Sequence, residues 1–445
     1  MKPPRSKILF GVTGGIAAYK APELLHGWVK MGCEVETLLT QAAEEFVSPM
    51  VLATLSKRRV WRERDFLSAE YGWQIPHISL TDWADIFVVA PATANALRVA
   101  AEGDGSTLLG SALLANKKPL LMFPAMNVNM LSSEAVRRHI LTLTERGAVV
   151  VDPESGVLAC GCDGKGRLPS AEVINDYVKM ALCDKKELHG LKVAVTAGPT
   201  HEYIDPVRFI SNPSSGKMGY AIARAAFQRG ADVTLISGPS ALRPPAGIRV
   251  VNVVSAEEMF DACMEAQKSA DMIVKAAAVG DYRPVRRAEQ KIKRGASGGL
   301  TLELVQNRDI AAALGKIKRS GPILIGFAAE TQHVAENARR KMAEKNLDLI
   351  VSNDVSAAGA GFASDTNAIT IFRRGGEAES FSGTKEEAAH RILDAAAELI
   401  VDRKCPSTAP PFRLRGGRRS RTAANRCSEK GSAFAYRSDA TAASH

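Results

Sequence analysis

The sequence lacks both a long apolar run and a regular set of cysteines. No stretch of the 445 residues approaches the ~20 uninterrupted apolar residues that a membrane helix needs. The seven cysteines are scattered, at 33, 160, 162, 183, 263, 405 and 427, which argues against a disulfide framework. The only close pair is Cys-x-Cys, and no second pair or His-x-x-x-His unit stands at zinc spacing. We therefore expect reduced thiols, no zinc site and no membrane partner.

The two ends of the chain bear on its location and its charge. The N-terminus runs from a short basic tip straight into a strand-like stretch, so we expect a cytoplasmic protein without a signal peptide. The net charge is +10, and residues 402–445 supply most of it, with ten Lys/Arg against three Asp/Glu. This tail is rich in Arg, Ser, Ala, Gly and Pro, which predicts a disordered, solvated extension. It lacks interleaved aromatic residues, and we expect no specific nucleic-acid binding.

The rest of the chain consists of two α/β blocks. Each begins with an apolar strand, a glycine turn and an amphipathic helix, and further strands then alternate with helices. This alternation predicts two Rossmann-like domains with doubly wound parallel sheets, which bind ligands at the carboxyl ends of their strands. We place these domains at residues 1–190 and 191–401. The expected strands are 7–12, 33–40, 84–93, 118–126 and 147–153, then 191–200, 231–239, 270–279, 322–330, 347–354 and 368–372.

The first glycine turn, TGGI, is a candidate phosphate-binding loop. Backbone N–H groups of Gly14, Gly15 and Ile16 at the start of a helix could hold the phosphate of a flavin or a nucleotide. The turn lacks the full G-x-G-x-x-G spacing, and many strand-to-helix turns use glycine without binding anything. The motif alone therefore leaves both readings open.

Three further residues of the first block have the chemistry of catalytic groups. His77 follows a proline in QIPHISL, Asn127 follows an expected strand in PAMN, and Cys160 lies in the glycine-rich stretch LACGCDGKGR. A lone histidine is more often structural, an asparagine at this place often forms a turn, and most cysteines are buried and inert. Taken by itself, each residue leaves the structural reading open.

In the second block, cations and an amide surround the start of a helix in DPVRFISNPSSGKMG. Arg208, Asn212 and Lys217 there suit a phosphate or a carboxylate. The segment is not a P-loop, because Ser211 stands where the motif needs glycine and Met218 follows the lysine where it needs Ser or Thr.

The motifs of the first block, read in order, resemble a known family. They are GGIAAYK, PHISL, APATAN, PAMN and ACG-x-x-G-x-GR. Together they are similar to the flavin-dependent 4'-phosphopantothenoylcysteine decarboxylases, which implies a flavodoxin-like flavoprotein domain that binds FMN.

The motifs of the second block resemble the phosphopantothenate–cysteine ligases. They are TAGPT, DPVRFISN, SSGKMG, AAAVGDYRP, KIK, GFAAET and KNLDLIVSND. Fused in this order, the two sets are similar to the bacterial bifunctional proteins of coenzyme A biosynthesis over roughly residues 6–401.

The resemblance implies the chemistry of the ligase half. The carboxylate of 4'-phosphopantothenate would react with CTP and Mg²⁺ to give an acyl-cytidylate and pyrophosphate, and the amine of cysteine would then displace CMP. Asn212 would orient the acyl-cytidylate, and Arg208 would help to hold an anionic group. The implied CTP-binding residues are Ala277, Asp281, Lys291, Arg308, Asp309, Ile310, Phe327, Lys341 and Lys345.

The resemblance also implies the chemistry of the decarboxylase half. FMN would oxidise the cysteine thiol of the ligase product to a thioaldehyde, CO₂ would leave, and the resulting enethiolate would be protonated and reduced to 4'-phosphopantetheine. His77 would assist oxidation, Asn127 would bind the carboxylate and Cys160 would donate the proton. The implied FMN contacts are Gly14, Gly15, Ile16, Thr40, Thr93, Ala94 and Asn95.

Two further implications concern assembly and departures from the family pattern. The resemblance implies a homo-oligomer, with trimeric flavin domains and dimeric ligase domains. The chain departs from the family at 102–109, where EGDGSTLL replaces a more acidic run, at Leu131, which replaces a bulkier residue, and at Leu168, which replaces a methionine. Arg308 stands where the family usually has proline.

Overall fold

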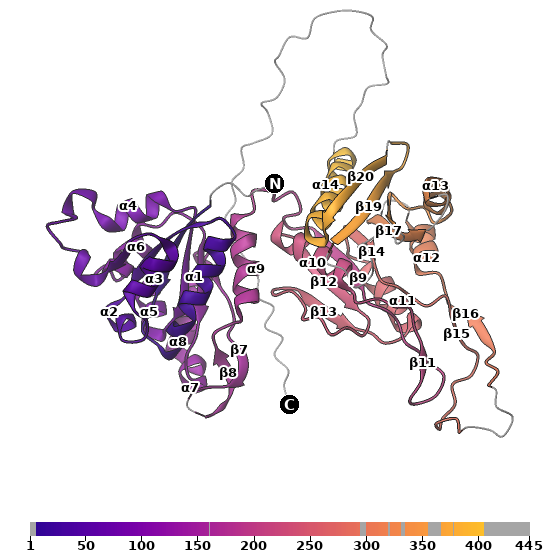
Figure 1. The fold of residues 1–445 in the computed structure, drawn as a ribbon, viewed down its shortest axis with the longest axis horizontal. Coiled ribbons are helices and arrows are strands. Elements are labelled where there is room, and N and C mark those ends of the chain that lie inside the picture. Colours follow the sequence, from indigo (N-terminus) through magenta and orange to yellow (C-terminus); the bar gives the residue numbers. More distant parts are fainter. Residues whose placement is uncertain are drawn as a thin grey trace, which may run out of the picture. The chain divides into compact units, whose positions relative to one another are not determined.

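The structure, a computed structural model, describes residues 6–159, 161–293, 300–318, 321–330, 334–354, 366–376 and 378–404 (Figure 1). These residues form two compact units, which divide between Leu182 and Cys183. Cys160 and residues 405–445 of the basic tail lie outside the described residues, so the predictions for them stay predictions. None of the described helices is both long enough and apolar enough to cross a membrane.

Six parallel strands form the sheet of the first unit, in the order β3-β2-β1-β4-β5-β6. From β1 the chain moves outward through β2 and β3, and it then returns to build the other half from β4. The connections therefore change direction between β1 and β4, which is where doubly wound sheets bind ligands. The strands are β1 (Lys7–Val12), β2 (Glu34–Leu39), β3 (Val60–Arg62), β4 (Ile86–Ala92), β5 (Leu120–Pro124) and β6 (Val149–Val150).

Helices cover both faces of this sheet, which explains why its central strands are apolar throughout. In β1, Ile8, Phe10 and Val12 pack against one group of helices, whereas Leu9 packs against the other, as the two-residue period of a strand requires. The first group is α1 (Ala21–Lys30), α3 (Pro49–Ser56) and α9 (Ala171–Leu182), and the second is α4 (Pro76–Trp83), α5 (Ala94–Glu102), α6 (Leu108–Ala115) and α8 (Glu134–Glu145). Two shorter helices, α2 (Gln41–Glu44) and α7 (Val128–Ser132), follow β2 and β5.

An antiparallel hairpin follows β6 and carries the stretch LACGCDGKGR. It consists of β7 (Glu154–Val157) and β8 (Asp163–Arg167). Two backbone hydrogen bonds close its tip, from the Leu158 amide to the Cys162 oxygen and from the Gly161 amide to the Leu158 oxygen, both 2.9 Å. Gly161 has a φ of +80°, in the left-handed region that favours glycine. The described residues on the two sides of position 160, Leu158 and Gly161, therefore lie at the end of a two-stranded arm.

Eight strands form the sheet of the second unit, in the order β13-β12-β9-β14-β17-β18-β19-β20. The first six are parallel, and the sequence predicted five of them but missed the edge strand β13. The strand expected at 368–372 as part of the parallel sheet is β19, which pairs antiparallel with β18, and β20 extends this antiparallel edge. The connection from β19 to β20 spans only residues 374–377, too few for the crossover that parallel strands need. The strands are β9 (Lys192–Ala197), β12 (Asp232–Ser237), β13 (Arg249–Asn252), β14 (Met272–Lys275), β17 (Ile323–Glu330), β18 (Leu349–Asp354), β19 (Thr366–Arg373) and β20 (Ala378–Thr384).

Helices also cover both faces of the second sheet. α10 (Lys217–Gln228) and α14 (Lys385–Lys404) pack together on one face. α11 (Ala256–Ala266), α12 (Ile310–Ile317) and α13 (Val334–Glu344) share a hydrophobic core on the other. Two small antiparallel arms lie outside this sheet, β10 (Glu202–Tyr203) with β11 (Phe209–Ile210), and β15 (Tyr282–Pro284) with β16 (Leu304–Gln306) (Figure 1).

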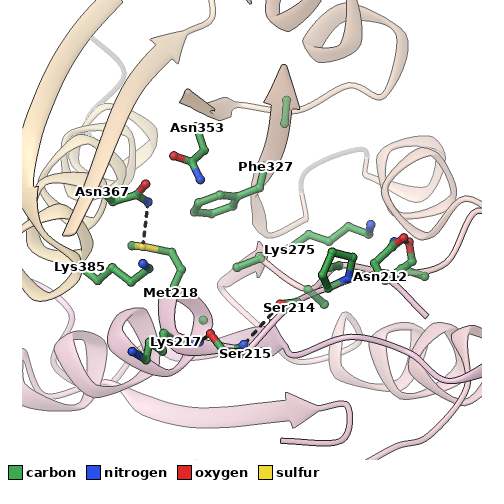
Figure 2. Close-up of a pocket in the computed structure, with 18 of the residues that line it drawn as sticks. Asn212, Ser214, Ser215, Lys217, Met218, Lys275, Phe327, Asn353, Asn367 and Lys385 are labelled. Carbon is green, nitrogen blue, oxygen red and sulfur yellow. Dashed lines mark hydrogen bonds between the residues drawn. The ribbon is translucent and has the colours of Figure 1, made fainter. Parts of the chain in front are cut away.

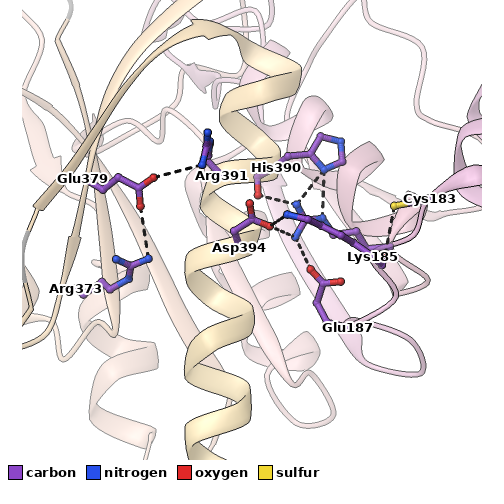
Figure 3. Close-up of polar contacts among 9 residues, drawn as sticks. Cys183, Lys185, Glu187, Arg373, Glu379, His390, Arg391 and Asp394 are labelled. Atoms are coloured by element: carbon purple, nitrogen blue, oxygen red, sulfur yellow. Dashed lines mark hydrogen bonds and ion pairs between the residues drawn. The ribbon is translucent and has the colours of Figure 1, made fainter. Parts of the chain in front are cut away.

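Arg229, the residue after α10, ties α14 and the start of the second unit to that helix. Figure 3 shows its partners Glu187, His390 and Asp394. The side chain of Arg229 is 0% exposed, and its Nη1 lies 2.8 Å from Glu187 Oε1 and 2.9 Å from Asp394 Oδ1. Nε donates to His390 Nδ1 at 3.2 Å, and Nη2 donates to the His390 carbonyl oxygen at 2.8 Å. Burial and the adjacent arginine lower the pKa of His390. Residues 183–190, which we expected at the end of the first domain, therefore pack on the second unit.

Candidate active sites

The first candidate site lies at the carboxyl edge of the first sheet, between β1 and β4. Thr13 follows β1, and its Oγ1 donates to the Pro91 carbonyl oxygen at 2.7 Å and accepts the Thr93 amide at 3.1 Å. Thr93 in turn caps α5, because its Oγ1 accepts the Ala96 amide at 3.3 Å. The loops after β1 and β4 are thus joined at the point where the sheet topology predicts a ligand.

Close packing at this edge requires glycine after β1. A Cβ on Gly14 would lie 2.4 Å from the Cβ of Ala42 and 2.7 Å from its carbonyl carbon, so no side chain fits between the loops that follow β1 and β2. The Thr40 amide donates to the Val12 oxygen at 3.1 Å and fixes the second of these loops. The residues expected to contact FMN lie in the three loops at this edge or in the first turn of the helix that follows, and they are Gly14, Gly15, Ile16, Thr40, Thr93, Ala94 and Asn95.

The loop after β5 joins the hairpin to the same unit. Asn127 caps α7, since its Oδ1 accepts the Asn129 amide at 2.8 Å. The Met126 amide donates to the Gly166 oxygen at 3.0 Å, and a Cβ on Gly166 would lie 2.2 Å from the Met126 oxygen. β8 therefore packs directly on the segment that precedes Asn127, which brings the hairpin that carries Cys160 to the Asn127 loop.

His77 lies in the first turn of α4. Its ring packs edge-on against Phe66, with 5.7 Å between ring centroids. Its Nδ1 is buried, and none of the described residues gives it a hydrogen-bond partner. A buried polar atom without a partner costs free energy, and a bound ligand would remove that cost.

The second candidate site is a pocket of about 500 Å³ in the second unit (Figure 2). It opens where β14, β17 and β18 end, beside the start of α10 and β19. The described residues that line it are Asn212, Pro213, Ser214, Ser215, Gly216, Lys217, Met218, Gly219, Lys275, Ala276, Ala277, Ala278, Val279, Asp281, Phe327, Ala328, Lys341, Lys345, Asn353, Asn367 and Lys385.

The first turn of α10 forms one wall of this pocket. Gly216 precedes the helix with a φ of +81°, and a Cβ there would lie 3.2 Å from the Gly198 amide nitrogen. Gly219 packs its turn on β9, because a Cβ would lie 2.5 Å from the Cβ of Ala197. The two glycines hold the positive end of α10, with Ser215 beside it, against the carboxyl edge of the sheet. Such a helix end attracts phosphate groups.

Positive charge dominates the pocket. Among the described residues that line it, five are lysines and one, Asp281, is a carboxylate. Just outside the lining, Asp309 forms an ion pair with Lys345, with 2.8 Å between Oδ2 and Nζ. Burial alone would raise the pKa of Asp309, but hydrogen bonds from Lys345 and from the Ala312 amide lower it overall. The excess of ammonium groups suits a ligand with several negative charges.

Amide groups gather at the other end of the pocket. Asn353 and Asn367 lie near the ring of Phe327, on the side away from Asn212 (Figure 2). The Oδ1 atoms of both are buried without a hydrogen-bond partner among the described residues. Nδ2 of Asn367, by contrast, faces the sulfur of Met218 at 3.7 Å. Two acceptors beside an aromatic ring suit a planar ligand that carries N–H donors.

Comparison with known proteins gives the chain its family. The family model described as "Flavoprotein" matches residues 2–183, and the one described as "DNA/pantothenate metabolism flavoprotein C-terminal domain" matches residues 188–400. The chain is 42% identical over 399 residues to the coenzyme A biosynthesis bifunctional protein CoaBC of Vibrio parahaemolyticus, covering 88% of this chain and 98% of that protein. The chain belongs to the CoaBC family. The fusion of a decarboxylase with a ligase, which the motifs implied, is confirmed.

Other relatives and two solved structures are also similar to this chain in sequence. The CoaBC proteins of Bacillus subtilis and Escherichia coli are 43% and 41% identical, and the matches cover 88% and 87% of this chain and 97% and 96% of those proteins. A crystal structure of a CoaBC C-terminal domain is 41% identical and covers 49% of this chain and 99% of that one, with a TM-score of 0.42. A PPC decarboxylase variant complexed with pantothenoylaminoethenethiol is 30% identical and covers 40% and 98%, with a TM-score of 0.37.

The structure brings together only part of the set implied for the ligase half. Asn212, Ala277, Asp281, Phe327, Lys341 and Lys345 line the pocket. The remaining residues lie outside its lining. Ile310 is 1% exposed in the hydrophobic core, and Asp309 caps α12 while it pairs with Lys345. Arg208 Nη2 donates to the Ile292 oxygen at 2.6 Å, which places it beside the exposed Lys291.

Arg308 also lies outside the pocket lining, and its contacts are with α11. Its guanidinium pairs with Glu257 and Asp261, and it stacks on the ring of Phe260 at 3.6 Å. An arginine in place of the family's usual proline thus gains a local set of partners on a neighbouring helix.

The departure at 102–109 likewise forms a local network. Arg98 pairs with Glu102 at 2.8 Å and with Asp104 at 3.1 Å. Hydrogen bonds from Ser106, together with Arg98, lower the pKa of Asp104 to about 2. Thr107 caps α6 by accepting the Gly110 amide at 3.0 Å. The replaced run therefore remains ordered and partnered at the start of α6.

Several pocket residues were missing from the sequence-based set. Lys275 stands in the middle of the expected strand ADMIVKAAAV, at 270–279, which gave no signal for a ligand site. In the structure β14 ends at Lys275, so this residue lies at the carboxyl edge of the sheet. Lys385 and Asn367 come from the last helix and from the antiparallel edge. No local pattern could place them, because only the folding of that edge onto β18 brings them to the pocket.

Proposed function

We propose that the second unit joins cysteine to 4'-phosphopantothenate with CTP and that the first unit decarboxylates the product to 4'-phosphopantetheine. The observation that carries the first half is the pocket beside α10, whose described lining has five lysines against one carboxylate. Both CTP and 4'-phosphopantothenate are polyanions. The observation that supports the second half is the glycine-lined edge between β1 and β4.

Asn212 is positioned for the ligase reaction. Its Nδ2 donates to the Val279 oxygen at 3.0 Å, which holds the amide beside the segment that follows β14. The carboxylate of 4'-phosphopantothenate would attack the α-phosphorus of CTP to form the acyl-cytidylate and release pyrophosphate. Asn212 would hold this intermediate while the amine of cysteine attacks its acyl carbon and CMP leaves.

Lysines and the start of α10 would hold the phosphates. Lys341 and Lys345 face the pocket, and the first turn of α10 supplies backbone N–H groups. Among the described residues, no cluster of three or more His, Cys, Asp or Glu could hold a metal ion. Mg²⁺ would therefore arrive with CTP, bound mainly by its phosphates and water, as is usual for this ion.

The amide end of the pocket would hold the cytosine base. The ring of Phe327 offers a face for stacking, and the unpartnered Oδ1 atoms of Asn353 and Asn367 are acceptors for the exocyclic amino group. This arrangement supports CTP as the nucleotide.

FMN fits the edge of the first sheet. The absence of a side chain at Gly14 lets the loops after β1 and β2 pack closely, and Thr13 and Thr93 join the loops after β1 and β4, so backbone N–H groups at this edge would be held in place for the phosphate of FMN. FMN would supply the electron sink that makes loss of CO₂ possible. His77, whose Nδ1 is buried and unpartnered among the described residues, would assist oxidation of the thiol.

The hairpin would complete this site. Asn127 lies at the start of α7, where its amide can bind the carboxylate that is lost, and β8 packs on the adjoining segment. We assign proton donation to Cys160, which the sequence places between β7 and β8. Cys160→Ser should stop product formation after CO₂ loss, whereas Cys162→Ser, two residues away and exposed, should retain full turnover. Full turnover by the first variant would remove Cys160 from this role.

Self-association of both units is part of the proposal. The arms of the second unit expose Phe209 (43%), Tyr282 (53%) and Leu304 (43%), and the first unit exposes Tyr19 (63%) and Met50 (77%). Exposed apolar side chains favour protein contacts, which supports self-association, and the dimers of ligase domains and trimers of flavin domains follow from the family resemblance. We place the enzyme in the cytoplasm, where its substrates are made.

One assay tests the two activities together. The purified protein is given 4'-phosphopantothenate, cysteine, CTP and Mg²⁺, and both pyrophosphate and CO₂ are followed. We expect one CO₂ for each pyrophosphate, and yellow protein from bound FMN. Pyrophosphate without CO₂ would contradict the decarboxylase half, and the absence of both would contradict the whole proposal.

A further inference from the structure

Lys275 is a pocket residue with no role in the reaction derived so far. It is the last residue of β14, which pairs with β9 on one side and β17 on the other, so it lies at the carboxyl edge in the middle of the sheet. Its side chain is half-buried and lines the pocket, between Phe327 and Asn212 (Figure 2). The residue thus stands at the centre of the proposed site.

The ammonium of Lys275 differs from the other charged groups of the pocket in its surroundings. None of the described residues forms a hydrogen bond or an ion pair with it. Two other pocket lysines differ in this respect, because Lys345 pairs with Asp309 at 2.8 Å and Lys385 donates to the Thr366 oxygen at 3.2 Å. The charge of Lys275 is therefore available to a ligand.

The same unit shows what a purely structural buried cation looks like. Arg229 is fully buried, and it is neutralised by Glu187 and Asp394 and hydrogen-bonded to His390 (Figure 3). This is the usual state of a buried charge, since an unpaired one is expensive. Lys275 breaks this rule at the one place in the unit where polyanionic substrates are proposed to bind.

The charged groups around Lys275 do not remove this cost. Burial lowers the pKa of Lys275, and the more distant carboxylates of Asp309 and Asp281 offset the effect only in part. Lys345 lowers the pKa further, and the remaining neighbour, the Cys263 thiol, is itself held protonated, with its pKa raised by burial to about 12. An anionic oxygen placed beside Lys275 would supply the missing counter-charge.

We propose that Lys275 is a substrate-binding residue of the ligase site, whose ammonium contacts an anionic phosphate or carboxylate oxygen of the bound substrates. The contact is strong because the site is partly withdrawn from water and already charged. The contact can also persist during the reaction, since the acyl-cytidylate and the departing CMP each carry an anionic phosphate. This inference rests on the proposed ligase function.

Binding measurements on three variants test the contact. Lys275→Met removes the charge and keeps much of the apolar stem, Lys275→Arg keeps the charge, and Lys268→Met makes the same change at an exposed lysine of the Glu265 ion pair outside the pocket. CTP with Mg²⁺ and 4'-phosphopantothenate are titrated separately by calorimetry. Lys275→Met should weaken one of them by about ten- to hundredfold, Lys275→Arg should recover most of that loss, and Lys268→Met should bind as the wild type does.

The two titrations identify the source of the anionic oxygen. A loss confined to CTP assigns Lys275 to the nucleotide phosphates, and a loss confined to 4'-phosphopantothenate assigns it to that substrate. Unchanged affinity of Lys275→Met for both substrates would overturn the inference. If the wild type binds neither substrate, the proposed function itself fails, so the two failures are distinct.

Stability measurements distinguish the loss of a ligand contact from the loss of the fold. At neutral pH the ammonium destabilises the ligand-free fold, because its pKa is lower in the folded chain than in the unfolded chain. Lys275→Met should therefore unfold at an equal or higher denaturant midpoint than the wild type while it binds substrate more weakly. A variant that loses stability along with binding would show a structural lysine and contradict the inference.

Discussion

The two sheets of this enzyme carry different chemical groups at the carboxyl ends of their strands. The first carboxyl edge is made of glycine, hydroxyl groups and backbone around Thr13, Gly14 and Thr93. The second is made of lysines around the start of α10, with one of them, Lys275, lacking any direct partner among the described residues. Similar parallel sheets thus provide a shape-fitted, uncharged edge and a cationic edge. The difference teaches that the sheet fixes where a ligand binds, and the residues after its strands fix which ligand.

The largest predicted effect concerns Arg229, a buried cation of the second unit that does not line the pocket. It tests whether such a cation stabilises the fold. Arg229→Met should lower the free energy of unfolding of the second unit by about 3 kcal/mol, because it removes a fully buried guanidinium together with its two ion pairs and its hydrogen bonds to His390. Glu187 loses this cation, whereas Asp394 keeps its pair with Lys185. Denaturant unfolding of the variant and of the wild type measures this difference in the free energy of unfolding. A loss below about 1 kcal/mol would mean that this network does not hold α14 to α10, and the contrast with Lys275 would fail.

The next effect concerns the uncharged edge. Gly14→Ala should weaken FMN binding by roughly ten- to hundredfold, because the new Cβ would meet Ala42 at 2.4 Å. Gly27→Ala is the matched control, since a Cβ at that helical position has nothing within 4 Å. Visible absorbance after gel filtration measures the retained flavin. Equal retention by both variants would show that the Gly14 turn does not border the flavin.

The pH dependence of binding should separate the two edges. An anionic ligand restores the lowered pKa of Lys275, so binding at the second edge takes up a proton. Affinity at that edge is therefore highest below the ligand-free pKa and falls as the pH rises toward 10.5, by no more than about tenfold per pH unit. Lys275→Arg should flatten this decline. Titrations between neutral and alkaline pH check both statements, and a decline identical in the two proteins would exclude Lys275 as its source.

The smallest effect concerns a charge on the surface of the second unit. Arg308→Ala should lower the free energy of unfolding by less than about 1 kcal/mol, because Arg308, Glu257 and Asp261 are all well exposed. High salt should remove most of even this difference. A decrease in the free energy of unfolding as large as that of Arg229→Met would contradict the view that a buried, paired cation stabilises this unit more than an exposed one.

Much of the fold was predictable because local patterns decide it. Apolar runs bounded by glycine turns correctly gave five of the six strands in the first sheet and the parallel core of the second. The short β3 was missed, as was the β7–β8 hairpin, because few residues and many glycines leave no apolar alternation to read. The antiparallel edge depends on a pairing of β18 with β19 that no local pattern signals.

The candidate site was predictable where its residues follow expected strands. Thr93, Asn127 and Asp281 all stand just beyond strand ends, and the structure places them at carboxyl edges. Arg308 and Ile310 follow no expected strand, and one contacts α11 while the other is buried in the core. Proximity in sequence cannot tell which way a side chain faces, and the family resemblance carries no information on a residue such as Arg308 that departs from it.

The most direct test of separate roles for the two edges uses one variant of each. Gly14→Ala and Asn212→Ala are assayed for pyrophosphate release from CTP and, in a second assay, for CO₂ release from supplied 4'-phospho-N-pantothenoylcysteine. We predict that Gly14→Ala loses CO₂ release and keeps pyrophosphate release, and that Asn212→Ala shows the reverse. Loss of both activities in either correctly folded variant would contradict the assignment of one reaction to each edge.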